Sequence, residues 1–553
     1  MYLLYHRIRY NMTYMSVRLK TLSIYFIYCL LGVVGVLSMF SPMIFSRFTM
    51  VQPGPGDAIF NAIILEHVYK SFFSSHYAGN FYSPIFFYPR QLTLTYSDNL
   101  LGSAPIYWLL RIFFGQFLSF GLWEIIVCVL TFAAFVYFLR YLKVDPIVAG
   151  VLSFIFTFGA PRAESTAHVQ IFAQFYTPLF FLFLYRLLKS PTLKDFNIAM
   201  LLLFLQTLAG YYLGWFLIFS LCILLFAYVL CARDELLRLV VFVKLYKIKL
   251  IKHTILWAFV FLLFWAPYIS TSMFFRYRWD INWMIRRLPT LQMYTDFPPG
   301  GLYAKIFNIP LIRESHEIGL GYGSFLSLGL FGLLVAYTGI KLFSRKLKVD
   351  FSLKFARALY LTAIIITLLS IKIFNFSFWT LIYSAIPGAD GVRYVYRIWL
   401  ITYFYLFTAV GIYWKYFSFS NKWYVYPLLT FFVVEQLVFY QKSFVFSYFS
   451  NIEGLISQKV TSSNCGLFYV RTFYNEEPKT IVYTISAMWA AIETNIPTIN
   501  GYSGIELYDF QKPLELADIA KTLDGKYKGT FCYLTVTNAA GDLSVSKYVF
   551  PFK

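Results

Sequence analysis

The first candidate for chemistry is a carboxylate that follows a run of prolines and glycines. Asp57 ends the sequence QPGPGD, and apolar residues at helical spacing follow it at positions 60, 63, 64 and 68. This pattern predicts that Asp57 caps the N-terminus of an amphipathic helix lying at a membrane surface. Two roles stay open for its side chain. It either caps the helix or lies near a lipid phosphate, where it acts as a general base or as a ligand of a divalent metal ion.

Two further carboxylates lie in the same segment. Glu66 is nine positions after Asp57, so on one continuous helix it faces away from Asp57 and is a poor partner for it. Asp98 lies in SDNLLGSAP, after a stretch in which aromatic residues alternate with prolines. We expect Asp98 to cap a helix over 100–118, and a catalytic role is the alternative.

Three arginines and a histidine are candidates for binding a phosphate. Arg393 and Arg397 are four positions apart, which predicts that they share one helix face. Two arginines can hold a phosphate through bidentate hydrogen bonds, and the alternative is an ion pair with Asp390. Arg162 and His168 flank the ends of two predicted helices. We expect Arg162 to assist phosphate binding, whereas His168 is either an interface residue or a base or ligand.

These residues must be positioned by a chain of unusual composition. Of its 553 residues 59% are hydrophobic and 13% are charged, and its mean hydropathy is +0.63. Soluble domains carry about 25% charged residues, so a water-soluble enzyme, a disordered chain and a fibrous repeat are excluded. Runs such as 22–45 and 213–231 reach the ~20 residues that cross a bilayer as a helix. The sequence therefore predicts an all-α polytopic membrane protein.

Basic residues between the apolar runs predict the orientation of the chain. The first 21 residues contain basic residues and no acid, which places the N-terminus in the cytoplasm. Eleven crossings put every later basic cluster on the cytoplasmic side. The predicted crossings are 22–45, 120–142, 146–160, 168–187, 196–212, 214–231, 252–272, 319–341, 356–372, 398–416 and 424–442. A further crossing at 100–118 would reverse all later loops. We therefore expect a helix there on the outer membrane face, with Tyr107 and Trp108 at headgroup level.

The same orientation places the longest loop and the C-terminus outside. We divide the chain into a multi-span membrane domain, 1–451, whose outer loop 46–119 carries the surface helices, and a small extracytoplasmic α+β domain, 452–553. Strands are expected in the latter at 480–485 and 531–536. It contains two cysteines, Cys465 and Cys532, which can form a disulfide on that side of the membrane if their Cα atoms lie within about 7 Å.

The net charge of +21 does not indicate a nucleic-acid partner. Residues 452–553 carry nine Lys and Arg against ten Asp and Glu, whereas the rest of the chain carries 38 against 16. That excess falls largely between apolar runs, where cytoplasmic loops are expected to be basic. We therefore expect membrane lipids as partners and no nucleic acid.

This order of features resembles the GT-C superfamily of integral-membrane glycosyltransferases, which take sugars from polyprenyl-phosphate carriers. The resemblance rests on PGPGD ending at Asp57, FYP at 87–89, SDNLLGSAP at 97–105, Ala160-Pro161-Arg162 with His168 and Gln170, and PGADGVRYVYR at 387–397. It implies that Asp57 is the catalytic or metal-binding residue. Many members of the family have a second acid beside the first, and Ala58 stands there in this chain.

We therefore expect a multi-pass glycosyltransferase of the inner or plasma membrane that uses a lipid-linked sugar donor. Sugar moves to a cell-envelope acceptor on the outer face, with Asp57 as base or metal ligand and with Arg393, Arg397 and Arg162 at the lipid phosphate. The sequence has no GxxxxGK[ST], GxGxxG or HExxH motif, which favours a lipid-linked donor over a nucleotide sugar. The rival classes are a lipid or polysaccharide transporter or flippase and a non-catalytic assembly protein of the same fold. Transporters often carry ionisable residues near mid-span, and here the strong acids lie in loops or near span ends, except Glu124 and Glu435.

Overall fold

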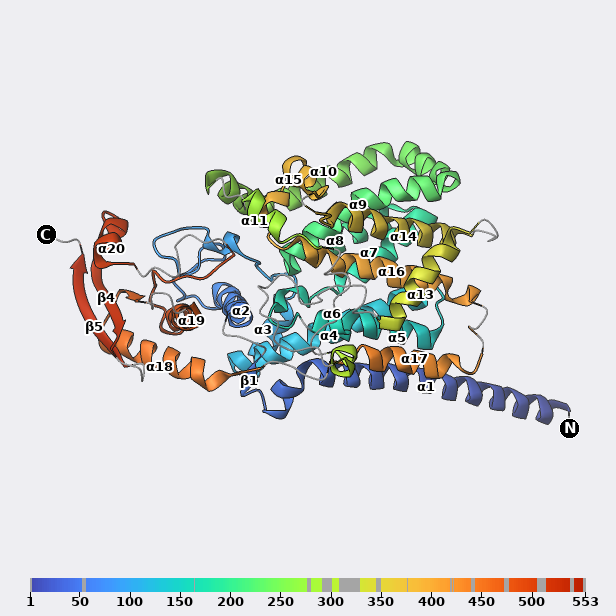
Figure 1. Ribbon diagram of the computed structural model, residues 1–553, viewed down its shortest axis with the longest axis horizontal. Coiled ribbons are helices and arrows are strands. Elements are labelled where there is room, and N and C mark those ends of the chain that lie inside the picture. Colours follow the sequence, from blue (N-terminus) through green and yellow to red (C-terminus); the bar gives the residue numbers. More distant parts are fainter. Residues whose placement is uncertain are drawn as a thin grey trace.

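The structure is a computed structural model of the 553-residue chain. It describes every residue except 1, 52–55, 164, 276–279, 291–300, 308–328, 345–349, 375, 418–419, 421, 439–442, 472–476, 505–513, 538–541 and 551–553. A bundle of helices makes up most of the molecule, and a smaller unit with a short sheet lies at one end of the long axis (Figure 1).

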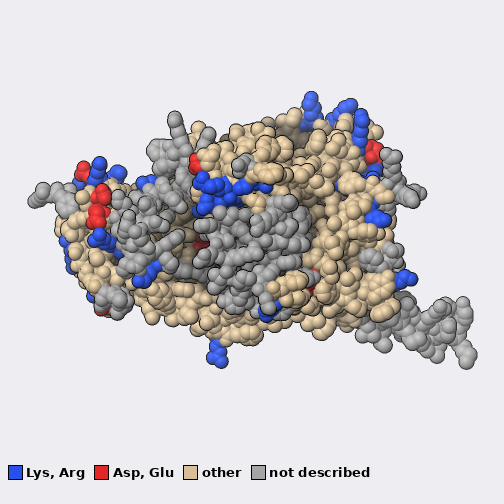
Figure 2. Space-filling model, in the orientation of Figure 1, with Lys and Arg blue, Asp and Glu red and all other residues tan. Residues whose placement is uncertain are grey.

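Eight helical segments of the described chain are long and apolar enough to cross a membrane. They contain α1 (Tyr2–Phe45), α4 (Gln116–Tyr141), α5 (Pro146–Phe158), α7 (Tyr176–Lys189), α9 (Tyr211–Cys231), α10 (Leu236–Phe275), α14 (Phe351–Ser370) and α16 (Trp399–Tyr413). The chain is thus a membrane-spanning helical protein. Figure 2 shows wide areas of the bundle without charged residues, as a lipid-facing surface requires, with Lys and Arg at the end remote from the C-terminus, in a patch near the middle of the view and at the C-terminal end.

The count of eleven crossings is not confirmed. Eight of the eleven predicted runs coincide with the segments above, and the other three coincide with shorter helices, α8 (Leu193–Ala209), α13 (Gly329–Leu342) and α17 (Val425–Glu435). These have 17, 14 and 11 residues, fewer than the ~20 that span a bilayer. Residues 319–328 of the predicted eighth run lie outside the described residues.

The centre of the bundle is α16. All 15 of its residues are buried, and it packs against α14, α5 and α9. A helix that is apolar on every side can be enclosed by other helices at no cost in unsatisfied polar side chains. The packing of α16 therefore fixes the position of the segment that precedes it, which contains Arg393 and Arg397.

The predicted surface helix after Asp57 is instead buried. In α2 (Asp57–Phe73) every residue from Ala58 to Val68 is buried within the protein, whereas Phe72 and Phe73 at its end are exposed, so most of the helix lacks the exposed polar face of an amphipathic helix. It packs against α4 and the short α3 (Ala104–Arg111) on one side and against the C-terminal residues on another. The prediction was wrong because the segments that cover the exposed half of α2 are distant in the sequence.

The second predicted surface helix is α3, which has eight residues and is too short to cross a membrane. Tyr107 is fully buried within the protein and donates a hydrogen bond to Glu66 Oε2 at 2.6 Å, so its ring is not exposed, and its place at headgroup level stays a prediction. Arg111 adds an ion pair to the same carboxylate at 2.8 Å. A buried carboxylate needs such partners, and Glu66 supplies the polar contact that draws the tyrosine inward.

The residues after 445 form a small α+β unit, which we call the C-terminal unit (Phe446–Phe550). Strand β3 (Leu467–Val470) pairs in parallel with β4 (Gly529–Val536), and β4 pairs antiparallel with β5 (Leu543–Phe550). Helices α18 (Phe446–Ser462), α19 (Glu477–Thr494) and α20 (Leu516–Leu523) accompany them. Figure 1 places this unit beside α2 and α3.

Two predictions for this unit are confirmed and one is wrong. The strand expected at 531–536 lies in β4, and Cys465 and Cys532 form a disulfide with their Cα atoms 5.7 Å apart. The strand expected at 480–485 is instead part of α19. Every residue of α19 from 482 to 492 is buried, so packing on all sides of the helix outweighs the β propensity of its Val, Ile and Thr residues.

Candidate functional site

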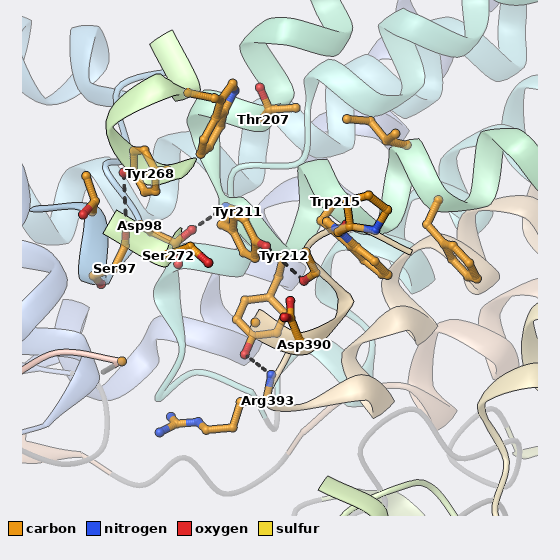
Figure 3. Close-up of a pocket in the computed structure, with 18 of the residues that line it drawn as sticks. Ser97, Asp98, Thr207, Tyr211, Tyr212, Trp215, Tyr268, Ser272, Asp390 and Arg393 are labelled. Carbon is orange, nitrogen blue, oxygen red and sulfur yellow. Dashed lines mark hydrogen bonds between the residues drawn. The ribbon is translucent and has the colours of Figure 1, made fainter. Parts of the chain in front are cut away.

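A cavity of about 1130 Å³ lies between α9, α10, the loop after α2 and the segment before α16. Its polar end contains Asp57, Asp98, Arg393, Arg397 and Tyr502. Its other wall is apolar and follows α9 at every third or fourth residue, through Tyr211, Trp215, Ile218, Phe219, Cys222 and Phe226. Figure 3 shows Asp98 beside Tyr211 and Arg393 beside Tyr212. The cavity is therefore amphiphilic, with charge at one end and hydrocarbon along its length.

Asp57 presents its carboxylate to this cavity from the first residue of α2. The N-cap is Gly56 and no side chain caps the helix, so the predicted capping role of Asp57 is wrong. Instead its Oδ2 lies 2.8 Å from His168 Nδ1, and its Oδ1 accepts a hydrogen bond from the Tyr502 hydroxyl at 2.7 Å. The carboxylate is thus held by two side chains that are far from it in the sequence. Its place at a helix N-terminus also favours the negative charge.

These contacts decide the charge of Asp57. Burial by itself raises the pKa of this carboxyl, but the hydrogen bond and charge of His168, the charge of Arg393 and the hydrogen bond from Tyr502 together hold the pKa well below its ordinary value. Asp57 is therefore ionised throughout the physiological pH range. A buried charge held by several partners in a cavity is a feature of functional sites.

Arg393 and Arg397 both line the polar end of the cavity, although not for the reason expected. Arg393 lies in a bend and Arg397 in a short 3₁₀ turn (Val395–Ile398), so they do not share a helix face. The guanidinium of Arg393 lies 4.6 Å from the ring centre of Tyr394, and that of Arg397 lies 4.8 Å from the same ring. The backbone N–H of Arg393 donates to the Tyr212 hydroxyl at 3.1 Å (Figure 3). Aromatic rings, rather than helix periodicity, bring the two cations together.

Arg397 is the more buried of the two. Its side chain is 3% exposed, and its Nη2 has no hydrogen-bond partner among the residues that the structure describes. An unmade hydrogen bond at a buried charged donor is costly, on the order of 1–3 kcal/mol. The cavity therefore presents a donor that an anionic ligand could satisfy.

Arg162 does not reach the cavity. It is 1% exposed, and it donates hydrogen bonds to the carbonyl oxygens of Phe156 and Ile171 and to the side chain of Gln174. Its donors hold the turn between α5 and α7 together. We therefore do not retain Arg162 among the phosphate-binding candidates.

Two further carboxylates, those of Asp98 and Asp390, line the cavity. Asp98 does not cap the helix that follows it, because its Oδ1 accepts a hydrogen bond from the backbone N–H of Tyr211, at the N-terminus of α9 (Figure 3). Burial raises the pKa of Asp98 to about 6, against the lowering effects of the Tyr211 hydrogen bond and the charge of Arg397.

His168 and Gln170 fix the first turn of α2 from the other side. His168 contacts Asp57, and Gln170 accepts a hydrogen bond at 3.0 Å from Asn61, whose amide also donates to the Asp57 carbonyl oxygen. Gln170 lines the cavity, whereas His168 does not. The structure therefore does not place His168 at the predicted phosphate site, and His168 acts on Asp57 instead. The sequence reasoning missed Tyr502, for which the Asn500-Gly501 turn signal just before it was the available hint.

A metal ion fits these residues poorly. Both oxygens of Asp57 already have partners, and within the described part of the chain no three His, Cys, Asp or Glu side chains lie close enough to hold a metal ion. Metal sites in proteins generally need more than one such ligand. We therefore derive no chemistry through a metal ion.

No family model matches the chain, and no curated protein matches it. The chemistry of the site must therefore be argued from its geometry. The cavity combines three aspartates, two guanidinium groups and a long apolar wall, an arrangement suited to an amphiphile with a polar head that the two guanidinium groups can bind.

Proposed function

We propose that the protein is a membrane glycosyltransferase that transfers a sugar from a polyprenyl-phosphate carrier to a hydroxyl group of a cell-envelope acceptor. The observation that carries the proposal is the amphiphilic cavity, which has Asp57, Arg393 and Arg397 at one end and the apolar face of α9 along its length. A lipid-linked sugar has the matching order of parts, namely a hydrocarbon chain, a phosphate and a sugar.

The apolar wall supports binding of the lipid chain. The lining residues of α9 extend from Tyr211 to Phe226, which at 1.5 Å per residue is a length of roughly 22 Å. Ile218 and Phe226 are 41% and 60% exposed, so this wall is open along its side. A polyprenyl chain would bury apolar surface there at about 25 cal/mol for each Å² removed from water.

The two arginines support binding of the phosphate. A guanidinium presents its donors in a planar fork that matches phosphate oxygens. The unpartnered Nη2 of Arg397 would gain an acceptor, and the negative charge that develops on the leaving phosphate would lie beside two fixed cations. This arrangement favours the transition state over the bound donor.

Asp57 supports the transfer step itself. The acceptor oxygen forms a bond to the anomeric carbon while the bond from that carbon to the phosphate oxygen breaks, and the bonding electrons leave with the lipid phosphate. Attack from the opposite face inverts the anomeric configuration, and the hydroxyl proton passes to the Asp57 carboxylate. Because the pKa of Asp57 is low, this proton moves late, when the attacking oxygen is already bonded to carbon and strongly acidic.

We further propose that the cavity opens toward the outer face, with eleven crossings, a cytoplasmic N-terminus and an extracytoplasmic C-terminal unit. The disulfide between Cys465 and Cys532 supports this side, since disulfides persist in oxidising compartments. Reporter fusions test the orientation. A fusion after residue 115 should report the outer side and one after residue 143 the cytoplasm, and a cytoplasmic signal at 115 would contradict the proposal.

The test of function is turnover of a radiolabelled polyprenyl-phosphate sugar by the purified protein in lipid bilayers. Asp57→Asn keeps the size of the side chain and removes its charge, so transfer should fall by at least ~100-fold while the protein is still produced and binds the lipid phosphate. Full activity of Asp57→Asn would refute the catalytic role. Movement of the lipid between leaflets without transfer would favour a flippase, and neither activity would favour an assembly protein.

A further inference from the structure

A tyrosine of the C-terminal unit reaches the proposed catalytic carboxylate from 445 positions away. Tyr502 lies in a loop that follows α19, whereas Asp57 begins α2. The loop carrying Tyr502 is held by contacts of three kinds: backbone pairing, close packing and a buried amide.

The backbone pairing joins this loop to the outer loop that follows α2. Thr498 N–H donates to the Ile85 carbonyl at 2.9 Å, and the N–H groups of Phe87 and Tyr88 donate to the carbonyls of Asn500 and Thr498, each at 3.0 Å. Three main-chain hydrogen bonds therefore fix the register between two segments of the chain. Main-chain pairing of this kind leaves little freedom for the residue that follows.

Close packing fixes the next residue. A Cβ atom on Gly501 would lie 2.2 Å from the ring of Phe87, so the chain can approach this ring only with glycine at that position. The side chain of Asn500 also donates to the Val470 carbonyl and accepts from the Val470 N–H, at 2.8 and 2.7 Å. The loop is thereby tied both to the sheet of the C-terminal unit and to the outer loop.

These contacts of the loop direct the side chain of Tyr502 toward α2. Its ring meets the ring of Phe60 edge to face at 5.3 Å, and its hydroxyl donates to Asp57 Oδ1 at 2.7 Å. Tyr502, Ser503 and Gly504 line the cavity together with Asp57. A separate contact, from Lys70 Nζ to the Ile492 carbonyl at 2.9 Å, joins the far end of α2 to the same unit.

We propose that Tyr502 is a positioning residue for Asp57, and that docking of the C-terminal unit on α2 completes the site. This inference rests on the proposed transfer function. The hydroxyl of Tyr502 orients one carboxylate oxygen and stabilises its charge, so that the other lone pairs of Asp57 face the acceptor. The C-terminal unit is then a working part of the site rather than an appended domain.

The charge of Asp57 is the quantity that reports this role. The groups that act on it are His168 and Tyr502 through hydrogen bonds, and Arg393, Arg397 and Asp98 through charge. Loss of the Tyr502 hydrogen bond moves the pKa of Asp57 upward, because that bond stabilises the ionised form. In the native protein His168 also lowers the pKa of Asp57, so loss of the Tyr502 hydrogen bond alone would leave that pKa low.

The experiment is therefore a pH profile of kcat in a His168→Leu background, with and without Tyr502→Phe. Phenylalanine keeps the ring packed on Phe60 and removes only the hydroxyl. Hydrogen bonds to charged groups change such equilibria by roughly tenfold to a hundredfold, so the acid limb should move up by about one to two pH units. The KM for the polyprenyl-phosphate sugar should stay unchanged, because Arg393 and Arg397 remain in place.

Tyr88→Phe in the same background is the matched control. The Tyr88 hydroxyl donates to the Lys526 carbonyl at 3.1 Å, so it makes the same kind of contact between the outer loop and the C-terminal unit, away from Asp57. Its removal should leave the acid limb where it is. An unmoved limb in Tyr502→Phe, or an equal movement in Tyr88→Phe, would overturn the proposal.

A second measurement separates this proposal from the transfer function. The infrared band of the protonated Asp57 carboxyl can be isolated by subtracting the spectrum of the matching Asp57→Asn variant, and its titration requires no turnover. A band that appears at higher pH in His168→Leu/Tyr502→Phe than in His168→Leu supports positioning even if no sugar is transferred. Identical titrations would refute positioning even if transfer is observed.

Discussion

The replacement Arg397→Lys tests the anion site with the smallest change in charge. The native guanidinium is 3% exposed and lies between the rings of Tyr212 and Tyr394, at 5.1 and 4.8 Å from their centres. Lysine keeps the positive charge but loses the planar fork and the stacking. Within the described residues, Nη2 of Arg397 lacks a partner, and this is the donor available to a ligand.

The size of the effect follows from that donor. A hydrogen bond to a charged group contributes roughly 1.5–3 kcal/mol, and each 1.4 kcal/mol is a factor of ten in affinity. Loss of the contact should therefore weaken binding of a polyprenyl phosphate by roughly tenfold to a hundredfold. The stacking on two tyrosines contributes to folding in the free protein as well as in the complex, so its loss should largely cancel in the binding constant.

Equilibrium binding of a radiolabelled polyprenyl phosphate to protein in nanodiscs measures this change directly. Arg471→Lys is the matched control, because Arg471 forms an exposed ion pair with Glu515 at 2.8 Å in the C-terminal unit, and its replacement should leave the binding constant unchanged. Arg393→Lys should weaken binding in the same direction as Arg397→Lys. Affinities within twofold of the native value in both cavity variants would refute the assignment of the two arginines to the phosphate.

Three further predictions concern stability. Replacing Cys465 and Cys532 by serine opens a loop of 67 residues, which should lower the free energy of unfolding of the C-terminal unit by about 4 kcal/mol, and a melting temperature that does not respond would contradict this. Arg111→Met leaves the fully buried Glu66 without its cation and should cost about 3–5 kcal/mol in thermal unfolding, whereas a loss below about 1 kcal/mol would show that Tyr107 suffices. Because burial raises the pKa of Asp98 from 3.8 to about 6, its ionisation should reduce stability as the pH rises through this range, and Asp98→Asn should flatten that part of the pH–stability curve.

The local sequence pattern was sufficient to predict the elements that contact lipid or residues near them in the sequence. Apolar runs of about 20 residues predict helices such as α4 and α9 because a spanning segment must satisfy its own backbone. The β propensity of residues 531–536 likewise indicated strand β4, and the expected oxidising compartment made a disulfide between Cys465 and Cys532 possible. These features depend on short stretches of chain.

Tertiary contacts decided what the pattern missed. The capping rule assigned Asp98 to the next helix in the sequence, whereas the structure uses it at α9, more than 110 residues later. The surface assignment of α2 failed for the same reason, since the C-terminal unit covers it. Arg393 and Arg397 were predicted to lie together on one helix face. They do both line the cavity, but a loop that contacts tyrosines, and not a helix, brings them together. Tyr502 carries no local sign of its partner.

For a glycosyltransferase of the kind proposed above, the open side of the α9 wall has a consequence for how the rate depends on the lipid-linked donor. Ile218 and Phe226 line the cavity and are also exposed at the side of the bundle, so a lipid can enter by moving within the plane of the membrane. Entry then follows a two-dimensional encounter, and the relevant donor concentration is its mole fraction among the lipids rather than its amount per volume of solution. Diluting the donor with inert lipid slows such an enzyme, whereas diluting the vesicles with buffer does not.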